Sequence, residues 1–421
     1  MKTALAEFIK DTPAGEEADA ILRSCVHCGF CLASCPTYQL LGDELDSPRG
    51  RIYLMKQLLE GEPVSASTQL HLDRCLGCRA CESACPSGVE YGRLLDIGRA
   101  LTAERVPRPP RVRLKRFLLN KIVPYRKRTR TLLSLARWGR ALLPAALRTQ
   151  IPALPAALSA AARRWPPARH ARRVVLLEGC VQPALAAGIN PAAARVLDQV
   201  GISAIAVRAV GCCGALSQHL GVEADAQAQM KRNVDALWPA VEAGAQAVLT
   251  TSSACSAMLG DYGRLLQGQP QYAVRAARIS ALACDLSQLL AGESGALRDA
   301  LQRPRAPSDA RPAIGVAFQS PCSLQHALKA SGTIEPLLLA AGYTLTPVTD
   351  GGRCCGSAGT YSILQPELSQ QLLRRKLDAL TQGAPAVIAT ANIGCLQHLR
   401  SAAAIPVRHW VELIDERLPG D

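Results

Sequence analysis

The chain has 421 residues, 48% of them hydrophobic and 19% charged, a composition typical of a globular protein with two or three domains. It has no run of about 18 apolar residues, so no membrane span is expected. It also lacks a signal-peptide start, so we expect a cytoplasmic protein whose seventeen cysteines are thiols and metal ligands and form no disulfide framework. The formal net charge of +14 comes from residues 105–173, which hold 19 Lys and Arg and no acid, and since no DNA-reading motif accompanies them, no nucleic-acid partner is expected.

Two cysteine runs of identical spacing come first in the chain. Each reads C-x2-C-x2-C-x3-C-P, at residues 25–36 and 75–86, which is the spacing of bacterial two-cluster ferredoxins. Zinc sites more often show two pairs of ligands, so runs of four favour iron–sulfur clusters. Three thiolates can surround one cubane, and the fourth, beside proline, crosses to the other. We therefore predict two [4Fe-4S] clusters, one held by Cys25, Cys28, Cys31 and Cys85, and the other by Cys75, Cys78, Cys81 and Cys35.

Helices are predicted around both runs. Residues 16–24 form the first, and Ser47-Pro48 starts another, because Ser is a good cap and Pro suits the first helical position. Gly61 is a suitable stop, and apolar residues at helical spacing predict a helix over 94–101. The stretch between the runs is longer than a compact βαββαβ ferredoxin needs. We predict a mainly α-helical two-cluster ferredoxin domain at residues 1–104.

Residues 105–172 are predicted to be a basic, proline-containing linker. Lys and Arg alternate here with Leu, Phe and Trp, and acidic residues are absent. This pattern is typical of an amphipathic segment that lies on an anionic membrane surface. The alternative is a basic linker that is simply solvated.

The rest of the chain is predicted to be a duplicated α/β unit. In each unit, a single cysteine is followed 32 residues later by a pair of adjacent cysteines. Cys180 is followed in this way by Cys212, and Cys322 by Cys354. Equal spacing and the same order of elements indicate duplication, so we predict cysteine-rich α/β repeats at 173–300 and 311–421. The expected strands lie at 173–180, 202–207, 247–251, 314–319 and 386–390, and the clearest helices at 192–201, 223–243 and 366–381.

The repeat cysteines follow strands, where parallel α/β sheets bind ligands. Glycine after each adjacent pair lets the backbone approach a bulky centre. An additional metal or iron–sulfur centre, a redox dithiol and buried structural thiols are the alternatives, and Cys284, which has no counterpart, is expected to be a plain thiol. His219, His326 and His398 are candidate proton carriers or ordinary polar groups. The candidate ligands are Cys180, Cys212, Cys213, Cys255, Cys322, Cys354, Cys355 and Cys395.

Taken together, these motifs resemble the iron–sulfur subunits of respiratory 2-hydroxyacid dehydrogenases, and most closely the glycolate oxidase subunits. The resemblance covers nearly the whole chain, most weakly 105–172. It implies an electron-transfer subunit at the cytoplasmic face of the inner membrane, in a complex whose FAD-bearing subunits oxidise glycolate to glyoxylate and pass electrons towards quinone or another respiratory acceptor. A lactate or glycerol-3-phosphate dehydrogenase complex is the alternative. The resemblance rests on both cysteine runs, both repeats, and residues 36–45, 47–51, 354–361 and 390–395.

The repeats also resemble the cysteine-rich domains of heterodisulfide reductase, which would make this chain a catalytic subunit. That pattern ends in Cys-x-x-Cys, whereas Met258 and His398 stand at the last position here. Because this ligand is missing twice, structural or interface thiols are expected, and about eight irons per chain from the two cubanes alone. No G-x-G-x-x-G follows a strand, so no flavin, nicotinamide or catalytic residue is expected in this chain.

Overall fold

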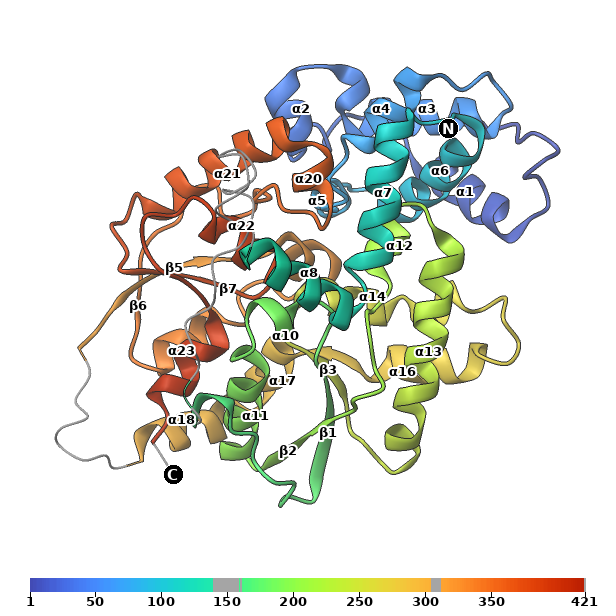
Figure 1. Cartoon of the computed structure of the whole chain (residues 1–421). Helices are drawn as coiled ribbons and strands as arrows, with labels where there is room; N and C mark the ends of the chain where they lie inside the picture. The colour runs from blue at the N-terminus through green and yellow to red at the C-terminus, as the bar shows by residue number, and fades with distance from the viewer. Residues whose placement is uncertain (139–158, 160, 304–311, 420–421) are drawn as a thin grey trace.

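The computed structural model contains, in chain order, a helical domain, two connecting helices and two α/β repeats, which confirms the predicted fold class (Figure 1). It describes residues 1–138, 159, 161–303 and 312–419. Parts of the predicted linker lie outside the described residues. So do residue 311, which begins the predicted second repeat, and the last two residues of the chain.

The N-terminal domain consists of short helices packed around the cysteine runs. They are α1 (Pro13–Ser24), α2 (Pro36–Leu41), the 3-10 turn η1 (Glu44–Asp46), α3 (Pro48–Leu59), α4 (Ala66–Asp73), α5 (Ala80–Ser83) and α6 (Tyr91–Arg105). The predicted cap is confirmed, because the Ser47 hydroxyl accepts a hydrogen bond from the Gly50 N–H at 2.9 Å and Pro48 follows it. Helix α6 packs against α1, α3 and α4 and buries Met55 and Leu94 in the core.

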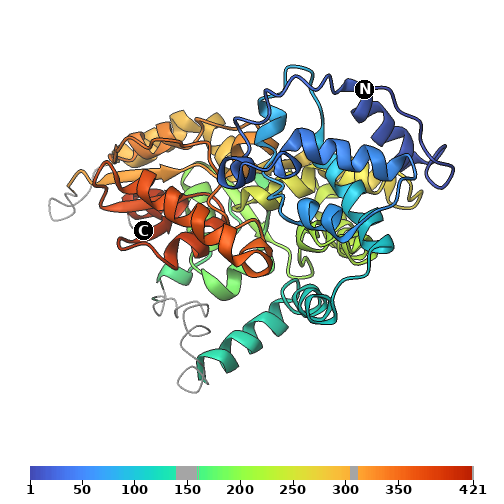
Figure 2. The ribbon, with the colours of Figure 1, turned by 90° about the horizontal axis from the view of Figure 1, so that it is seen from above.

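Two helices, α7 (Pro110–Ile122) and α8 (Arg126–Trp138), connect this domain to the repeats. Basic side chains hold them to the first repeat: Lys121 pairs with Asp225 at 2.6 Å, and Arg126 with Glu178 at 2.7 Å. Figure 2 shows α8 standing away from the main body, with the described chain resuming near the first repeat. The 3-10 turn η3 (Ala161–Arg163) then leads into the first sheet.

The first repeat is a four-stranded parallel sheet with strand order β2-β1-β3-β4. Its strands are β1 (Arg172–Leu177), β2 (Ile202–Ala206), β3 (Val248–Thr250) and β4 (Ala283–Asp285). The first three match predicted strands, whereas β4 has the sequence Ala-Cys-Asp and lacks the run of buried apolar residues that marks β3. The helices are α10 (Gln182–Leu185), α11 (Ile189–Gln199), α12 (Ala215–His219), α13 (Glu223–Glu242), α14 (Ser253–Gly260), α15 (Tyr262–Leu265), α16 (Ala273–Leu282), α17 (Leu286–Gly292) and α18 (Ser294–Gln302).

The second repeat has the same topology, with strand order β6-β5-β7-β8, all parallel. Its strands are β5 (Gly315–Gln319), β6 (Thr344–Leu345), β7 (Val387–Thr390) and β8 (Val407–His409). The first, second, third and fourth strands of each repeat occupy the same positions in the two sheets. This confirms the predicted duplication. The helical elements are the π-helix η5 (Ser323–Ala327), α19 (Glu335–Ala340), α20 (Tyr361–Leu364), α21 (Pro366–Thr381), α22 (Ile393–Arg400) and α23 (Trp410–Arg417).

The two repeats share a hydrophobic core, and polar contacts join all three parts of the molecule. One hydrophobic cluster contains residues of both sheets, and α11 packs against α23. The Nε2 atom of His409 in the second repeat lies 2.8 Å from the Thr251 carbonyl oxygen in the first. Ser83 Oγ of the helical domain lies 2.8 Å from His326 Nδ1, which ties that domain to the second repeat.

Candidate iron–sulfur sites

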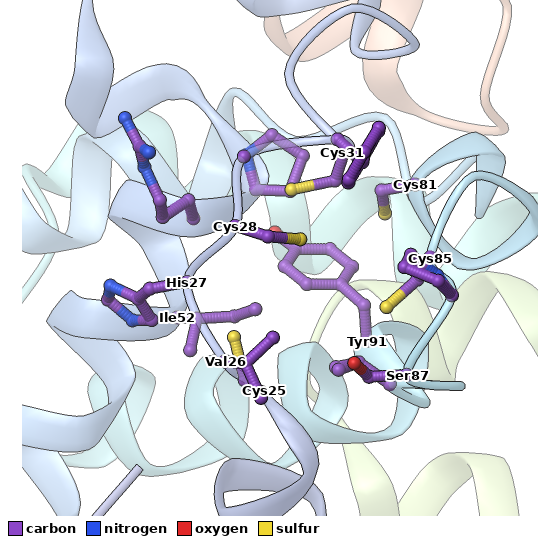
Figure 3. A pocket seen from close by; sticks show the side chains of 16 residues that line it. Cys25, Val26, His27, Cys28, Cys31, Ile52, Cys81, Cys85, Ser87 and Tyr91 are labelled. Atoms are coloured by element: carbon purple, nitrogen blue, oxygen red, sulfur yellow. The ribbon is translucent and has the colours of Figure 1, made fainter.

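Five cysteines, Cys25, Cys28, Cys31, Cys81 and Cys85, line one pocket of the helical domain that is partly open to solvent. Figure 3 shows the sulfur atoms of Cys25, Cys28, Cys31 and Cys85 around this pocket, with the Tyr91 ring behind them. Burial and, to a smaller extent, the neighbouring Cys25, Cys85 and Cys28 raise the pKa of the Cys31 thiol to about 11. Without a metal these thiols stay protonated. They can still be ligands, because the binding of a metal centre itself removes their protons.

The cysteines of the predicted second cluster, Cys35, Cys75, Cys78 and Cys81, gather at a second, more buried place. Cys35 and Cys75 are buried, and the charges of both act on Cys78 and Cys81. Burial raises the pKa values of Cys78 and Cys81 well above the ordinary thiol value. The structure thus brings Cys85 to the first run and Cys35 to the second, the grouping that the crossed ligand assignment needs, although ligation itself stays a prediction.

A buried arginine lies beside the second group. The Arg51 side chain is 1% exposed, its Nη1 donates to Cys35 Sγ at 4.0 Å, and its Nη2 pairs with Asp46 at 3.1 Å. Burial would raise the pKa of the Cys75 thiol, but the charges of Arg51 and Arg99 outweigh it and hold this pKa below its ordinary value. The second site is therefore built to stabilise negative charge on sulfur.

Sequence reasoning missed the roles of Arg51 and Tyr91. Tyr91 Oη donates a hydrogen bond to Cys75 Sγ at 3.5 Å. Arg51 stands in the 47–51 motif on which the family resemblance rests, and that position was the available signal. Nothing in the motif reveals that the side chain points inwards, because a charged residue on a helix is most often exposed.

The four thiols of the first repeat lie together at the carboxyl end of its sheet, as predicted. Cys212 is hydrogen-bonded to Cys180 and Cys213, and these two bonds hold the pKa of Cys212 well below its ordinary value. Cys213 is in turn hydrogen-bonded to Cys255. The Tyr262 hydroxyl donates to the Cys213 carbonyl oxygen at 2.8 Å and fixes the loop.

The second repeat gathers its thiols in the same way. Cys322 is hydrogen-bonded to Cys354, and Cys355 Sγ lies 3.3 Å from Cys395 Sγ. After burial, Cys322 is the largest influence on the pKa of Cys78, so this thiol group adjoins the second ferredoxin site. The equivalent thiol group in the first repeat lies near α8. Arg126, the first residue of α8, donates to the carbonyl oxygens of Gly179 and Val210, in the loops that carry Cys180 and Cys212.

The remaining candidates have other surroundings. Cys284 lies on β4, and its thiol contacts the Asp285 carbonyl oxygen at 3.4 Å. His219 is exposed at the end of α12, His326 binds Ser83, and the buried His398 Nε2 lies 3.1 Å from Ser369 Oγ. Two of the three histidines therefore have structural partners.

No helix within the described part of the chain is both long and apolar enough to cross a bilayer. The basic helices α7 and α8 instead expose apolar side chains to solvent. These are Val112, Leu114, Phe117, Leu118, Leu132 and Leu135.

Comparison with known families matches both halves of the chain. Residues 21–89 match the 4Fe-4S dicluster domain, and residues 174–260 and 316–400 each match the Cysteine-rich domain family. The two matches to one family agree with the duplicated sheets.

Comparison with individual proteins extends over the whole length. The chain is 48% identical to the glycolate oxidase iron-sulfur subunit of Escherichia coli over 99% of both chains. It is 32% identical to a probable glycolate oxidase iron-sulfur subunit of Bacillus subtilis, over 95% of this chain and 92% of the relative. Lactate utilization protein A of Geobacillus thermodenitrificans is 26% identical but covers 58% of this chain. The chain therefore belongs to the family of glycolate oxidase iron–sulfur subunits.

Proposed function

We propose that this chain is the electron-transfer subunit of a flavin-dependent complex that oxidises glycolate to glyoxylate. The observation that carries the proposal is the pair of adjacent four-cysteine groups in a chain 48% identical to a glycolate oxidase iron-sulfur subunit. Substrate oxidation and FAD belong to partner subunits, because no flavin-binding motif occurs in the sequence. The acceptor is quinone or another respiratory carrier.

The two cysteine groups are proposed to hold the two [4Fe-4S] clusters in the crossed arrangement. Such clusters carry one electron at a time, so two in series divide the electron pair that a flavin delivers. The protein supplies the thiolates, the Arg51 charge and the Tyr91 hydrogen bond at the second site. At the first site Cys28 is exposed, and the neighbouring Phe30 is 67% exposed, which supports exchange of electrons with a partner at that face.

The repeat thiols are proposed as additional centres. The sequence expectation of structural thiols rested on the missing last ligand, yet four thiols approach one another in each repeat without it. Four converging thiolates are the donor set of iron–sulfur and zinc sites. The group in the second repeat is the better placed for electron transfer, because it adjoins Cys78.

The helices α7 and α8 are proposed to lie on an anionic membrane at its cytoplasmic face. Their exposed surface combines Lys127 and Arg130 with the apolar Leu114, Phe117 and Leu135, which are 56–64% exposed. Basic and apolar groups together suit an anionic lipid surface better than water or a neutral one. This position would bring the clusters close to a membrane-dissolved acceptor.

Lactate is the weaker candidate substrate of the complex. Its support is the similarity to lactate utilization protein A, which covers 58% of this chain, whereas the glycolate oxidase relatives cover 95–99%.

The proposal is tested by anaerobic purification of the chain alone and with its flavin-bearing partners. Alone, it is expected to show no glycolate-dependent dye reduction. With the partners, glycolate is expected to reduce its clusters, as seen by EPR, faster than lactate does. Glycolate turnover by the isolated, flavin-free chain, or clusters that stay oxidised with all partners present, would contradict it.

A further inference from the structure

Tyr361 brings the second repeat into contact with the second ferredoxin site. It is the first residue of α20, six residues after Cys355, and it is 5% exposed. Helix α21, which follows α20 directly, packs against α2 of the helical domain. The groups whose charges act on Tyr361 are Cys75, Arg51, Cys354 and Asp46. Its side chain therefore lies between the helical domain and the thiols of its own repeat.

The Tyr361 hydroxyl is buried and has no hydrogen-bond partner among the described residues. A buried hydroxyl of this kind is unfavourable, and in native proteins such groups nearly always have a partner. Arg51 cannot serve as that partner, because a guanidinium has donors and no acceptor. Asp46 is also near, but its two carboxylate oxygens already accept from Arg51 and Arg74, which leaves the sulfur atoms of Cys75 and Cys354 as the acceptors to consider.

The chemistry of the phenol makes it a donor here. Burial raises the pKa of Tyr361, as do the neighbouring thiols, so the hydroxyl keeps its proton in the neutral pH range. Tyr91 shows the same chemistry nearby, since its hydroxyl donates to Cys75 Sγ at 3.5 Å. The charge of Cys75 thus acts on two tyrosines, which come from different domains.

We propose that Tyr361 donates a hydrogen bond to a sulfur of the second cluster, so that the second repeat helps to set that cluster's reduction potential. The proposal rests on the proposed function in one respect, that Cys35, Cys75, Cys78 and Cys81 hold a cluster. A donor to cluster sulfur stabilises the reduced form, which carries the extra negative charge, and so raises the potential. Tyr361 is a positioning and tuning residue, and it takes no part in bond making.

The test is an EPR-monitored redox titration of the full chain carrying Tyr361→Phe, which keeps the ring and removes only the hydroxyl. The potential of one cubane is expected to move in the negative direction while the other stays at its wild-type value. Tyr91→Phe should move the same cubane the same way. Tyr343→Phe is the matched control, because its hydroxyl binds the Leu413 carbonyl oxygen within the second repeat and it should move neither.

A second variant gives the opposite sign. Incorporation of 3-fluorotyrosine at position 361 makes the phenol a stronger donor, so the same potential should move in the positive direction. Unchanged potentials in both variants, or a shift of the cubane that Tyr91→Phe leaves alone, would overturn the proposal while leaving the electron-transfer function standing. Wild-type protein without two cubane signals would overturn both.

Discussion

Cys35 and Arg51 meet in the core of the helical domain, where the guanidinium donates to the thiol at 4.0 Å. Cys35 is the last cysteine of the first run, yet the charged helix α3 holds it among the cysteines of the second. The contact gives a physical reason for the crossing, because a thiolate at this point is stabilised by a buried positive charge.

Cys35→Ser is expected to damage the cluster proposed for Cys75, Cys78 and Cys81 and to spare the other. Serine removes one soft ligand and leaves the Arg51 charge without its thiolate. Mössbauer and EPR spectra of the anaerobic protein measure each cluster. Cys85→Ser is the matched control and should show the opposite selectivity. Loss of the same cluster in both variants would refute the crossed assignment.

Replacing Arg111, Arg113, Lys127 and Arg130 with Gln is expected to weaken binding to anionic vesicles. Each well-placed charge contributes about 1 kcal/mol, so the four together should reduce binding at least about tenfold. All four are exposed on α7 and α8. Co-sedimentation with vesicles of anionic and of neutral lipid, at low and at high salt, measures the effect.

The control for this surface carries Arg298, Arg374 and Arg375 replaced by Gln, because these residues are exposed on the two repeats. It should bind anionic vesicles as wild type does. If the helix variant also binds as wild type at both salt concentrations, α7 and α8 are not the membrane contact.

Cys354→Ala is expected to lower the iron content of the chain if the second repeat holds a centre. Wild type should then contain more than the about eight irons of two cubanes. Cys212→Ala tests the first repeat in the same way. Cys284→Ala is the control, because this thiol lies on β4 and binds the Asp285 carbonyl oxygen. A count of about eight in all four proteins would show that the repeat thiols are structural.

His409 is expected to make the folded state sensitive to acid. Burial lowers its pKa from 6.5 to about 4, and this effect outweighs the hydrogen bond from Nε2 to the Thr251 carbonyl oxygen, which raises the pKa; the charge of Arg400 lowers it as well. The unfolded chain takes up that proton first, so the stability from this group is present above pH 6.5 and is lost as the pH falls towards 4.

The measurement is the free energy of unfolding in urea at pH 7 and pH 5, under anaerobic conditions. His409→Gln keeps an amide donor for Thr251 and cannot titrate. The decrease between the two pH values should be smaller in the variant by about 2 kcal/mol. An equal decrease in both proteins would show that His409 is not the sensitive group.

Much of this architecture could be predicted from local sequence patterns. The Ser47-Pro48 pair marks the start of α3 because capping depends on neighbouring residues only. The C-x2-C-x2-C-x3-C-P spacing predicts the two groups of four thiols, because it limits which sulfurs can reach one centre. The equal intervals before Cys212 and Cys354 predict two sheets of one topology.

Other features depended on the tertiary structure. The strands β4, β6 and β8 are as short as β3 or shorter and lack its continuous buried apolar run, and they form because a neighbouring strand pairs with them. Ser83 and His326, separated by 243 positions, meet only because the helical domain packs on the second repeat.

The same distinction explains the surroundings of the second site. Cysteine spacing determined which thiols belong to it, since that spacing is a property of the chain. The burial of Arg51 comes from packing within the helical domain, and the position of Tyr361 near Cys75 comes from packing between domains. Local sequence therefore predicts the ligands, and only the tertiary structure decided the charge and the hydrogen bonds around these thiols.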